Sequence, residues 1–121
     1  MKERRQYVRA DTVTNIRWAK ETDKTKFQEQ IKNIGGGGVC LISKQRLEIG
    51  DLINLEIDLP TGKTIKAIGK VAWVNDFKIG DTEPNGNYYI GVEFVDISTG
   101  DRDLVQKFVF EYFQDIKSKS L

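Results

Sequence analysis

Apolar and polar residues alternate along much of this chain, which is the pattern of β-strands with one buried face. The alternation is clearest over residues 51–60, where isoleucine or leucine occupies every odd position from 53 to 59. A turn at 60–63 and a second run rich in β-branched residues at 63–74 predict a hairpin with this strand. Four further runs, at 11–18, 26–34, 38–43 and 87–97, bring the total to about six strands, so we expect an antiparallel β-barrel or sandwich.

The end of the chain follows a helical period instead. Apolar residues recur there in alternating steps of one and three, which places them on one broad face of a helix. Ser98 and Asp101 resemble a capping box with a shortened acid. We therefore expect a helix over residues 98–117 that buries its apolar face against an end or side of the barrel. The residues of that face are Leu104, Val105, Phe108, Val109, Tyr112, Phe113 and Ile116.

The composition is that of a single globular domain. The chain has 121 residues, of which 39% are hydrophobic, and this length suffices for one core. We expect an N-terminal arm over residues 1–10, a barrel over 11–97 and the helix over 98–117. Cys40 is the sole cysteine and lies in an apolar run, so we expect it to pack as a small hydrophobe. Because no long apolar stretch and no signal-peptide pattern is present, we expect no membrane insertion and a cytoplasmic location.

Several motifs of enzymes and metal sites are incomplete in this chain. It has no histidine and one cysteine, which excludes histidine-based catalysis and argues against a typical transition-metal site. The stretch 62–64, Gly-Lys-Thr, resembles the end of a phosphate-binding loop, but Ile57 replaces the required first glycine. Residues 81–86 resemble a calcium loop, yet Val92 stands where the closing glutamate would be. We expect no enzyme activity, no metal and no cofactor.

The charge of the chain is unevenly distributed. The formal net charge is +1 at pH 7, but the first nine residues hold four cations and one anion and so carry +3. The remaining residues are therefore slightly acidic. This distribution disfavours a protein that binds DNA or RNA through an overall basic surface, but it fits a local anion-binding arm.

Two unusual stretches supply candidate binding groups. Three arginines in the arm carry planar forks that suit phosphate oxygens and guanine edges, and they also stack on flat rings. Four consecutive glycines let backbone amides approach a ligand closely, and the asparagine before them offers an amide for a base edge. Together these groups indicate a site for a guanine nucleotide with phosphates, although a basic leader is also typical of a solvated tail and a glycine run of a flexible turn. The candidates are Arg4, Arg5, Arg9, Asn33, Gly35, Gly36, Gly37 and Gly38.

At these residues the chain resembles a PilZ domain, the bacterial receptor module for cyclic di-GMP. The family motif R-R-x-x-x-R matches residues 4–9, and the motif D/N-x-S-x-x-G aligns with residues 33–38. Looser similarities follow in the same order: a G-D turn at 50–51, a G-x-V-x-W-V strand at 69–74 and a G-V-x-F strand at 91–94. The resemblance runs from about Glu3 to the C-terminal helix.

The resemblance implies a mainly β fold, a six-stranded antiparallel β-barrel with one C-terminal α-helix. The arginine arm would wrap over the barrel when the ligand docks. Arg5 and Arg9 would hold phosphates and guanine edges, and Arg4 would stack on or contact a guanine. Asn33 would read a guanine's polar edge, and Gly38 would allow the tight backbone at the site. In this family an arginine in the place of Arg4 accompanies the binding of two stacked ligand molecules, so the resemblance favours that mode.

One residue departs from the family pattern, because Gly35 stands where the family has a serine. A neutral hydrogen bond contributes about 0.5–1.5 kcal/mol, so its loss should weaken binding roughly two- to twelve-fold rather than abolish it. Some PilZ domains bind no nucleotide, which leaves open an adaptor that acts only through protein contacts. A barrel that binds single-stranded RNA or DNA is a further alternative, and the near-neutral charge counts against it.

The expected function is that of a non-enzymatic receptor for cyclic di-GMP. We expect ligand binding to order the N-terminal arm and so to change the surface offered to an unidentified downstream protein. Neither DNA nor RNA is an expected partner.

Overall fold

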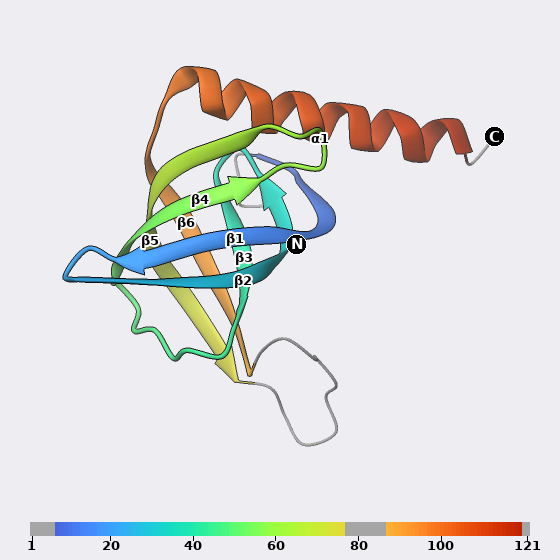
Figure 1. Ribbon diagram of the computed structural model, residues 1–121. Helices are drawn as coiled ribbons and strands as arrows, with labels where there is room; N and C mark the ends of the chain where they lie inside the picture. Colours follow the sequence, from blue (N-terminus) through green and yellow to red (C-terminus); the bar gives the residue numbers. More distant parts are fainter. Residues whose placement is uncertain (1–6, 77–86, 120–121) are drawn as a thin grey trace.

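The computed structural model describes residues 7–76 and 87–119, which form six β-strands and one α-helix (Figure 1). The strands pair antiparallel in the order β1-β2-β3-β6-β5-β4, and β4 pairs with β1, which closes the sheet into a barrel. The predicted six-stranded antiparallel β-barrel with one C-terminal helix is confirmed. The elements are β1 (Arg9–Lys20), β2 (Asp23–Gly35), β3 (Gly38–Ser43), β4 (Leu52–Asp58), β5 (Thr64–Asp76), β6 (Tyr88–Ile97) and α1 (Thr99–Lys119).

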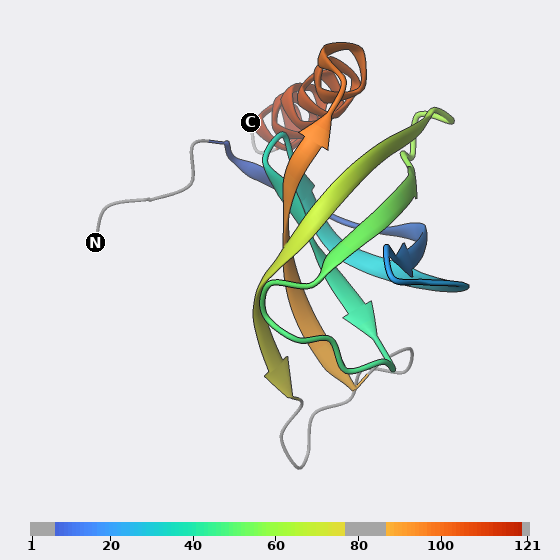
Figure 2. The same cartoon turned by 90° about the vertical axis from the view of Figure 1, so that its left-hand side faces the viewer.

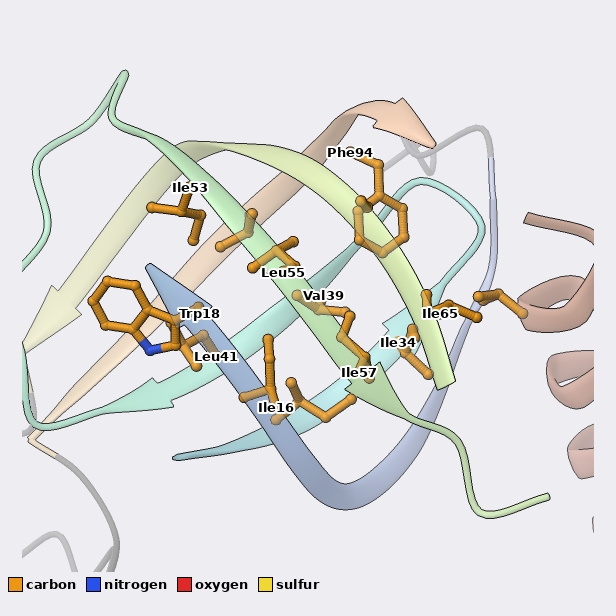
Figure 3. Close-up of a cluster of buried hydrophobic side chains, with 14 of the residues drawn as sticks. Ile16, Trp18, Ile34, Val39, Leu41, Ile53, Leu55, Ile57, Ile65 and Phe94 are labelled. Carbon is orange, nitrogen blue, oxygen red and sulfur yellow. The ribbon is translucent and has the colours of Figure 1, made fainter. Parts of the chain in front are cut away.

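The barrel interior is filled by side chains that alternate along the strands (Figure 3). In β4, Ile53, Leu55 and Ile57 are buried, whereas the residues between them are exposed or half-buried. These three pack with Ile16 and Trp18 of β1 in one continuous core. The period-two pattern of the sequence thus marks the buried face of this strand correctly.

A bidentate ion pair joins β1 to β4, where the barrel closes. Arg17 donates from Nη1 and Nη2 to the two carboxylate oxygens of Asp58, at 2.9 and 2.8 Å. The hydroxyl of Thr64 donates to the same carboxylate at 2.9 Å. The hydrogen bonds from Arg17, with help from Thr64, favour the charged form and lower the pKa of Asp58 from its ordinary value of 3.8 to about 2.

The helix α1 lies across one end of the barrel (Figure 1 and Figure 2). Val105 and Val109 are buried in the same core that fills the barrel. The N–H of Asp101 donates to Oγ of Ser98, which is one half of the predicted capping box. The carboxylate of Asp101 does not complete the box, because it accepts the backbone N–H of Lys66 in β5 at 2.9 Å. The first turn of the helix is therefore tied to the barrel.

The far half of α1 extends past the barrel (Figure 1). Phe113 and Ile116, which the sequence pattern places on the buried face, are 44% and 46% exposed. The expectation that the whole apolar face is buried is wrong for these two residues, because the helix is longer than the barrel end that it covers. Phe110, on the neighbouring side of the helix, is exposed as well.

The structure also shows what several short sequence motifs do. Gly62 has a φ of +93° in the turn between β4 and β5, so the stretch 62–64 is a hairpin turn. Cys40 is buried, as its apolar neighbours predict. Residues 81–86 lie outside the described residues. Within residues 7–76 and 87–119, no three potential metal ligands cluster, and no helix has the length and hydrophobicity to cross a bilayer.

Candidate functional site

The start of β1 and the end of β2 bring two candidate residues together. Arg9 lies opposite Gly35 in the ladder between these strands. Its Nη1 donates a hydrogen bond to Oδ1 of Asn33 across 3.2 Å, and both residues are half-buried. The arginine motif and the asparagine motif therefore meet on the barrel. Arg4 and Arg5 lie outside the described residues.

Two of the four glycines are required because a side chain would not fit there, and not because the backbone is left-handed. None of the four has a positive φ. A Cβ atom at Gly35 would overlap the carbonyl oxygen of Val8, and one at Gly38 would overlap the carbonyl oxygen of Val92 in β6. The first contact bears on the missing family serine, because this backbone has no room for a side chain at position 35. The second shows that Gly38 lets β3 and β6 approach each other closely.

The other two glycines form the turn against which the arm packs. A Cβ atom at Gly36 would lie 2.9 Å, and one at Gly37 3.0 Å, from the ring of Tyr7. Arg102 of α1 stands over the same ring, with its Cζ 5.5 Å from the ring centroid. Its Nε donates to the carbonyl oxygen of Gly36 at 3.2 Å. The arm, the turn and the helix therefore meet at one point.

A row of four residues crosses the barrel surface beside the Arg9–Asn33 contact. Asn33 pairs with Cys40, Cys40 with Gly91, and Gly91 with Trp73, from β2 through β3 and β6 to β5. Gly91 has no side chain, and the indole of Trp73 lies over it so closely that a Cβ atom there would overlap the ring. Trp73 is 39% exposed. The row thus presents a flat aromatic surface near a guanidinium and an amide.

A β-bulge turns Trp73 outwards. Strict alternation in β5 would place Trp73 on the inner face with Ile65 and Val71, both of which are buried. The register shifts by one residue between Val71 and Trp73, however, which leaves Ala72 as the extra residue of a bulge. The sequence pattern does not identify Trp73 as a site residue, because only its pairing with β6 reveals the shift. Arg102, Lys32 and Tyr89 are likewise site residues that local sequence patterns miss.

Two hollows of about 440 Å³ each flank Trp73, and both are also lined by Arg9. Volumes of this size are typical of small-molecule sites. One hollow extends towards the arm and the helix, where Tyr7, Glu93 and Arg102 line it. The other extends along β2, where Lys32, Asn33 and Tyr89 line it.

Cations outnumber anions around these hollows. Arg9, Lys32 and Arg102 line them, whereas Glu93 is the one acidic residue among the described residues that do so. Lys32 Nζ also lies 4.2 Å from the ring centroid of Tyr89. The arrangement suits an anionic ligand with flat rings, because guanidinium groups bind phosphates and an exposed indole stacks on bases.

A further hollow of about 430 Å³ on β1, β4 and β5 is a weaker candidate. Two of its three lining cations are paired, since Arg17 pairs with Asp58, and Lys26 Nζ lies 3.7 Å from the carboxylate of Glu56. The charges of that surface are therefore largely balanced.

Comparisons with known proteins bear on the fold and the family of this chain. The PilZ domain model matches residues 3–111. A search of curated proteins finds no match. The PilZ domain of YcgR from Escherichia coli, solved with cyclic di-GMP, is similar at a TM-score of 0.71 and 16% identity, over 98% of each chain.

Two longer proteins contain a similar fold. The Bacillus subtilis inhibitor of motility, MotI/DgrA, matches at a TM-score of 0.78 and 20% identity, over 93% of this chain and 52% of its own. MrkH of K. pneumonia, in complex with cyclic di-GMP, matches at a TM-score of 0.77 and 19% identity, over 97% of this chain and 55% of its own. This chain therefore spans about half the length of these two proteins, and the likeness is one of fold.

Proposed function

This chain belongs to the PilZ domain family, and we propose that it is a receptor for cyclic di-GMP. The observation that carries the proposal is the contact of Arg9 with Asn33 on the barrel surface beside the exposed indole of Trp73. A guanidinium, an amide and a flat ring are the groups that recognise a phosphate, the polar edge of guanine and a base face.

Each of these residues has a proposed role. Arg9 binds a phosphate and is held in place by Asn33, whose amide remains close enough to pair with a guanine edge. Trp73 stacks on a base. Arg4 and Arg5, which precede the described part of the chain, are proposed to add further phosphate and guanine contacts. The turn from Gly35 to Gly38 carries no side chains, so the ligand can approach its backbone without a clash.

We also propose that ligand binding orders the N-terminal arm. Tyr7, the first described residue of this arm, already contacts the glycine turn, and Arg9, where β1 begins, already contacts Asn33 of β2. A ligand held by Arg5 and Arg9 together would fix the residues between them. Saturating cyclic di-GMP should therefore slow amide hydrogen exchange in residues 1–10, and unchanged exchange there would contradict the ordering mechanism.

The proposed output is an altered surface for a downstream protein, without any catalytic step. The arm packs against the first turns of α1 through Arg102, and the same helix exposes Phe110 and Phe113 further along. An ordered arm would change the surface along this helix, which a cytoplasmic partner protein could detect.

Isothermal titration of cyclic di-GMP into the protein tests the receptor proposal. The wild type should bind saturably, and Arg5→Ala/Arg9→Ala should weaken binding at least about a hundredfold, because charge-assisted hydrogen bonds contribute about 1.5–3 kcal/mol each. The double variant Lys24→Ala/Lys44→Ala is the matched control. It removes two exposed cations, one near the start of β2 and one just after the end of β3, at the ends of these strands that lie away from residues 33–38. It should bind like the wild type.

The titration also decides between the open alternatives. A stoichiometry of two ligands per chain would support the mode expected from Arg4. A flat titration of the folded wild type would refute the receptor proposal and favour the adaptor that acts through protein contacts alone.

A further inference from the structure

A guanidinium from the helix faces the same hollow as the arm. Arg102, in the first turns of α1, lines the hollow that also contains Arg9 and Trp73. Its position is held by two contacts, the hydrogen bond from Nε to the carbonyl oxygen of Gly36 and the cation–π contact with the ring of Tyr7. None of the family motifs found in the sequence includes this helix position.

No described acidic residue forms an ion pair with Arg102. Among the ion pairs within residues 7–76 and 87–119, none involves this residue. Its hydrogen bond uses only the Nε edge, so the two terminal amino groups are left to donate to a ligand. An arginine fork of this kind matches two phosphate oxygens at once.

We propose that Arg102 is an additional phosphate-binding residue, which together with Arg9 holds a phosphate of the ligand between barrel and helix. The inference rests on the proposed binding of cyclic di-GMP. Glu93, the one carboxylate among the described lining residues, is exposed, so the two guanidinium groups dominate the electrostatic potential of the hollow.

This contact would make the helix part of the binding site rather than a distant element. The N–H of Arg102 donates to the carbonyl oxygen of Ser98, and the neighbouring Asp101 is tied to β5. A phosphate bound to Arg102 would therefore contact the first turn of α1 directly. The position of the helix would then depend on the ligand as well as on the arm.

Titrations of cyclic di-GMP into Arg102→Gln and Arg102→Lys, at low and high sodium chloride, test the proposal. Arg102→Gln should weaken binding about tenfold or more, the usual loss for a charge-assisted hydrogen bond. Arg102→Lys keeps the charge but loses the fork, so its affinity should lie between that of Arg102→Gln and that of the wild type. Salt should weaken binding less in Arg102→Gln than in the wild type, because one cation that salt screens is gone.

Lys107→Gln is the matched control, since it removes one exposed cation from the same helix, and it should bind like the wild type. An unchanged affinity of Arg102→Gln overturns the proposal. The proposal is also overturned if Arg102→Lys loses as much affinity as Arg102→Gln and both variants keep the salt dependence of the wild type. That result would indicate a purely structural role for Arg102. If the wild type does not bind cyclic di-GMP at all, the receptor function itself is refuted, and this outcome is distinguishable from the two results for the Arg102 variants.

Discussion

The indole of Trp73 lies over Gly91 in the neighbouring strand, at a point where any Cβ atom would overlap the ring. The two residues are cross-strand partners, and the bulge at Ala72 brings them into register. The absence of a side chain at Gly91 therefore allows the indole of Trp73 to take this position. This relationship makes the aromatic surface of the candidate site sensitive to a change that touches neither charge nor polarity.

Gly91→Ala should displace the indole and weaken the binding of cyclic di-GMP. Stacking of a base on an aromatic side chain contributes about 1–3 kcal/mol, so we expect a loss of about fivefold or more in a titration. Trp73→Phe keeps a flat ring and should lose less affinity than Trp73→Ala. Wild-type affinity in both Gly91→Ala and Trp73→Ala would show that the ring takes no part in binding.

Gly35→Ser restores the serine of the family motif but should not improve binding. The new Cβ atom would overlap the carbonyl oxygen of Val8, so the start of β1 must shift. We expect a loss of about 1–3 kcal/mol in the free energy of unfolding, as for other overpacked sites, and a weaker affinity. Gly100→Ser, at a position with open space around it, is the control for thermal unfolding. Tighter binding by Gly35→Ser at unchanged stability would mean that the strand accommodates the hydroxyl.

Asn33→Ala should weaken binding about tenfold with little change in stability. The substitution removes the acceptor that holds Arg9 and the amide proposed to read guanine. Asn33→Asp should bind at least as tightly as the wild type, because a carboxylate accepts hydrogen bonds from both Arg9 and the N–H groups of guanine. Titrations of both variants decide the matter, and equal losses in the two would contradict a role in reading the guanine edge.

Asp58→Asn should remove an acid-dependent part of the stability. The pKa of Asp58 is lowered to about 2 in the folded protein, below its ordinary value of 3.8, so its charged form stabilises the fold. This contribution is fully present above about pH 4 and is lost as the pH falls from there towards 2. The wild type and the variant should therefore differ in unfolding free energy near neutral pH and converge in acid. A difference that stays constant down to pH 2 would show that the ion pair with Arg17 is not its source.

Local pattern is sufficient to predict the strands and the helix but not the whole site. Residues 51–60 reveal their buried face through alternation, and Arg9 and Asn33 belong to motifs that are readable along the chain. Trp73 is not readable in this way, because its outward direction depends on a bulge that exists only in the pairing with β6. Arg102 escapes for a similar reason, since its contact with Gly36 joins residues that are far apart in the sequence. The length of the helix beyond the barrel, which exposes Phe113, also depends on tertiary dimensions.

The closure of the sheet between β1 and β4 limits how this domain can pass on a signal. Every neighbouring pair of strands in the ring is hydrogen-bonded, and among the described strands the backbone that lacks a partner on one side lies at strand ends, such as residues 23–29 of β2, which pair with β1 alone, and residues 9–15 of β1, which pair with β2 alone. A partner that docks by adding a strand of its own, the route that many peptide-binding domains use, is therefore limited to these short stretches. Elsewhere on the domain, recognition relies on side chains of the outer face, the arm or α1, so a partner's specificity there should be set by surface shape and charge, and alanine substitutions on that surface should map it.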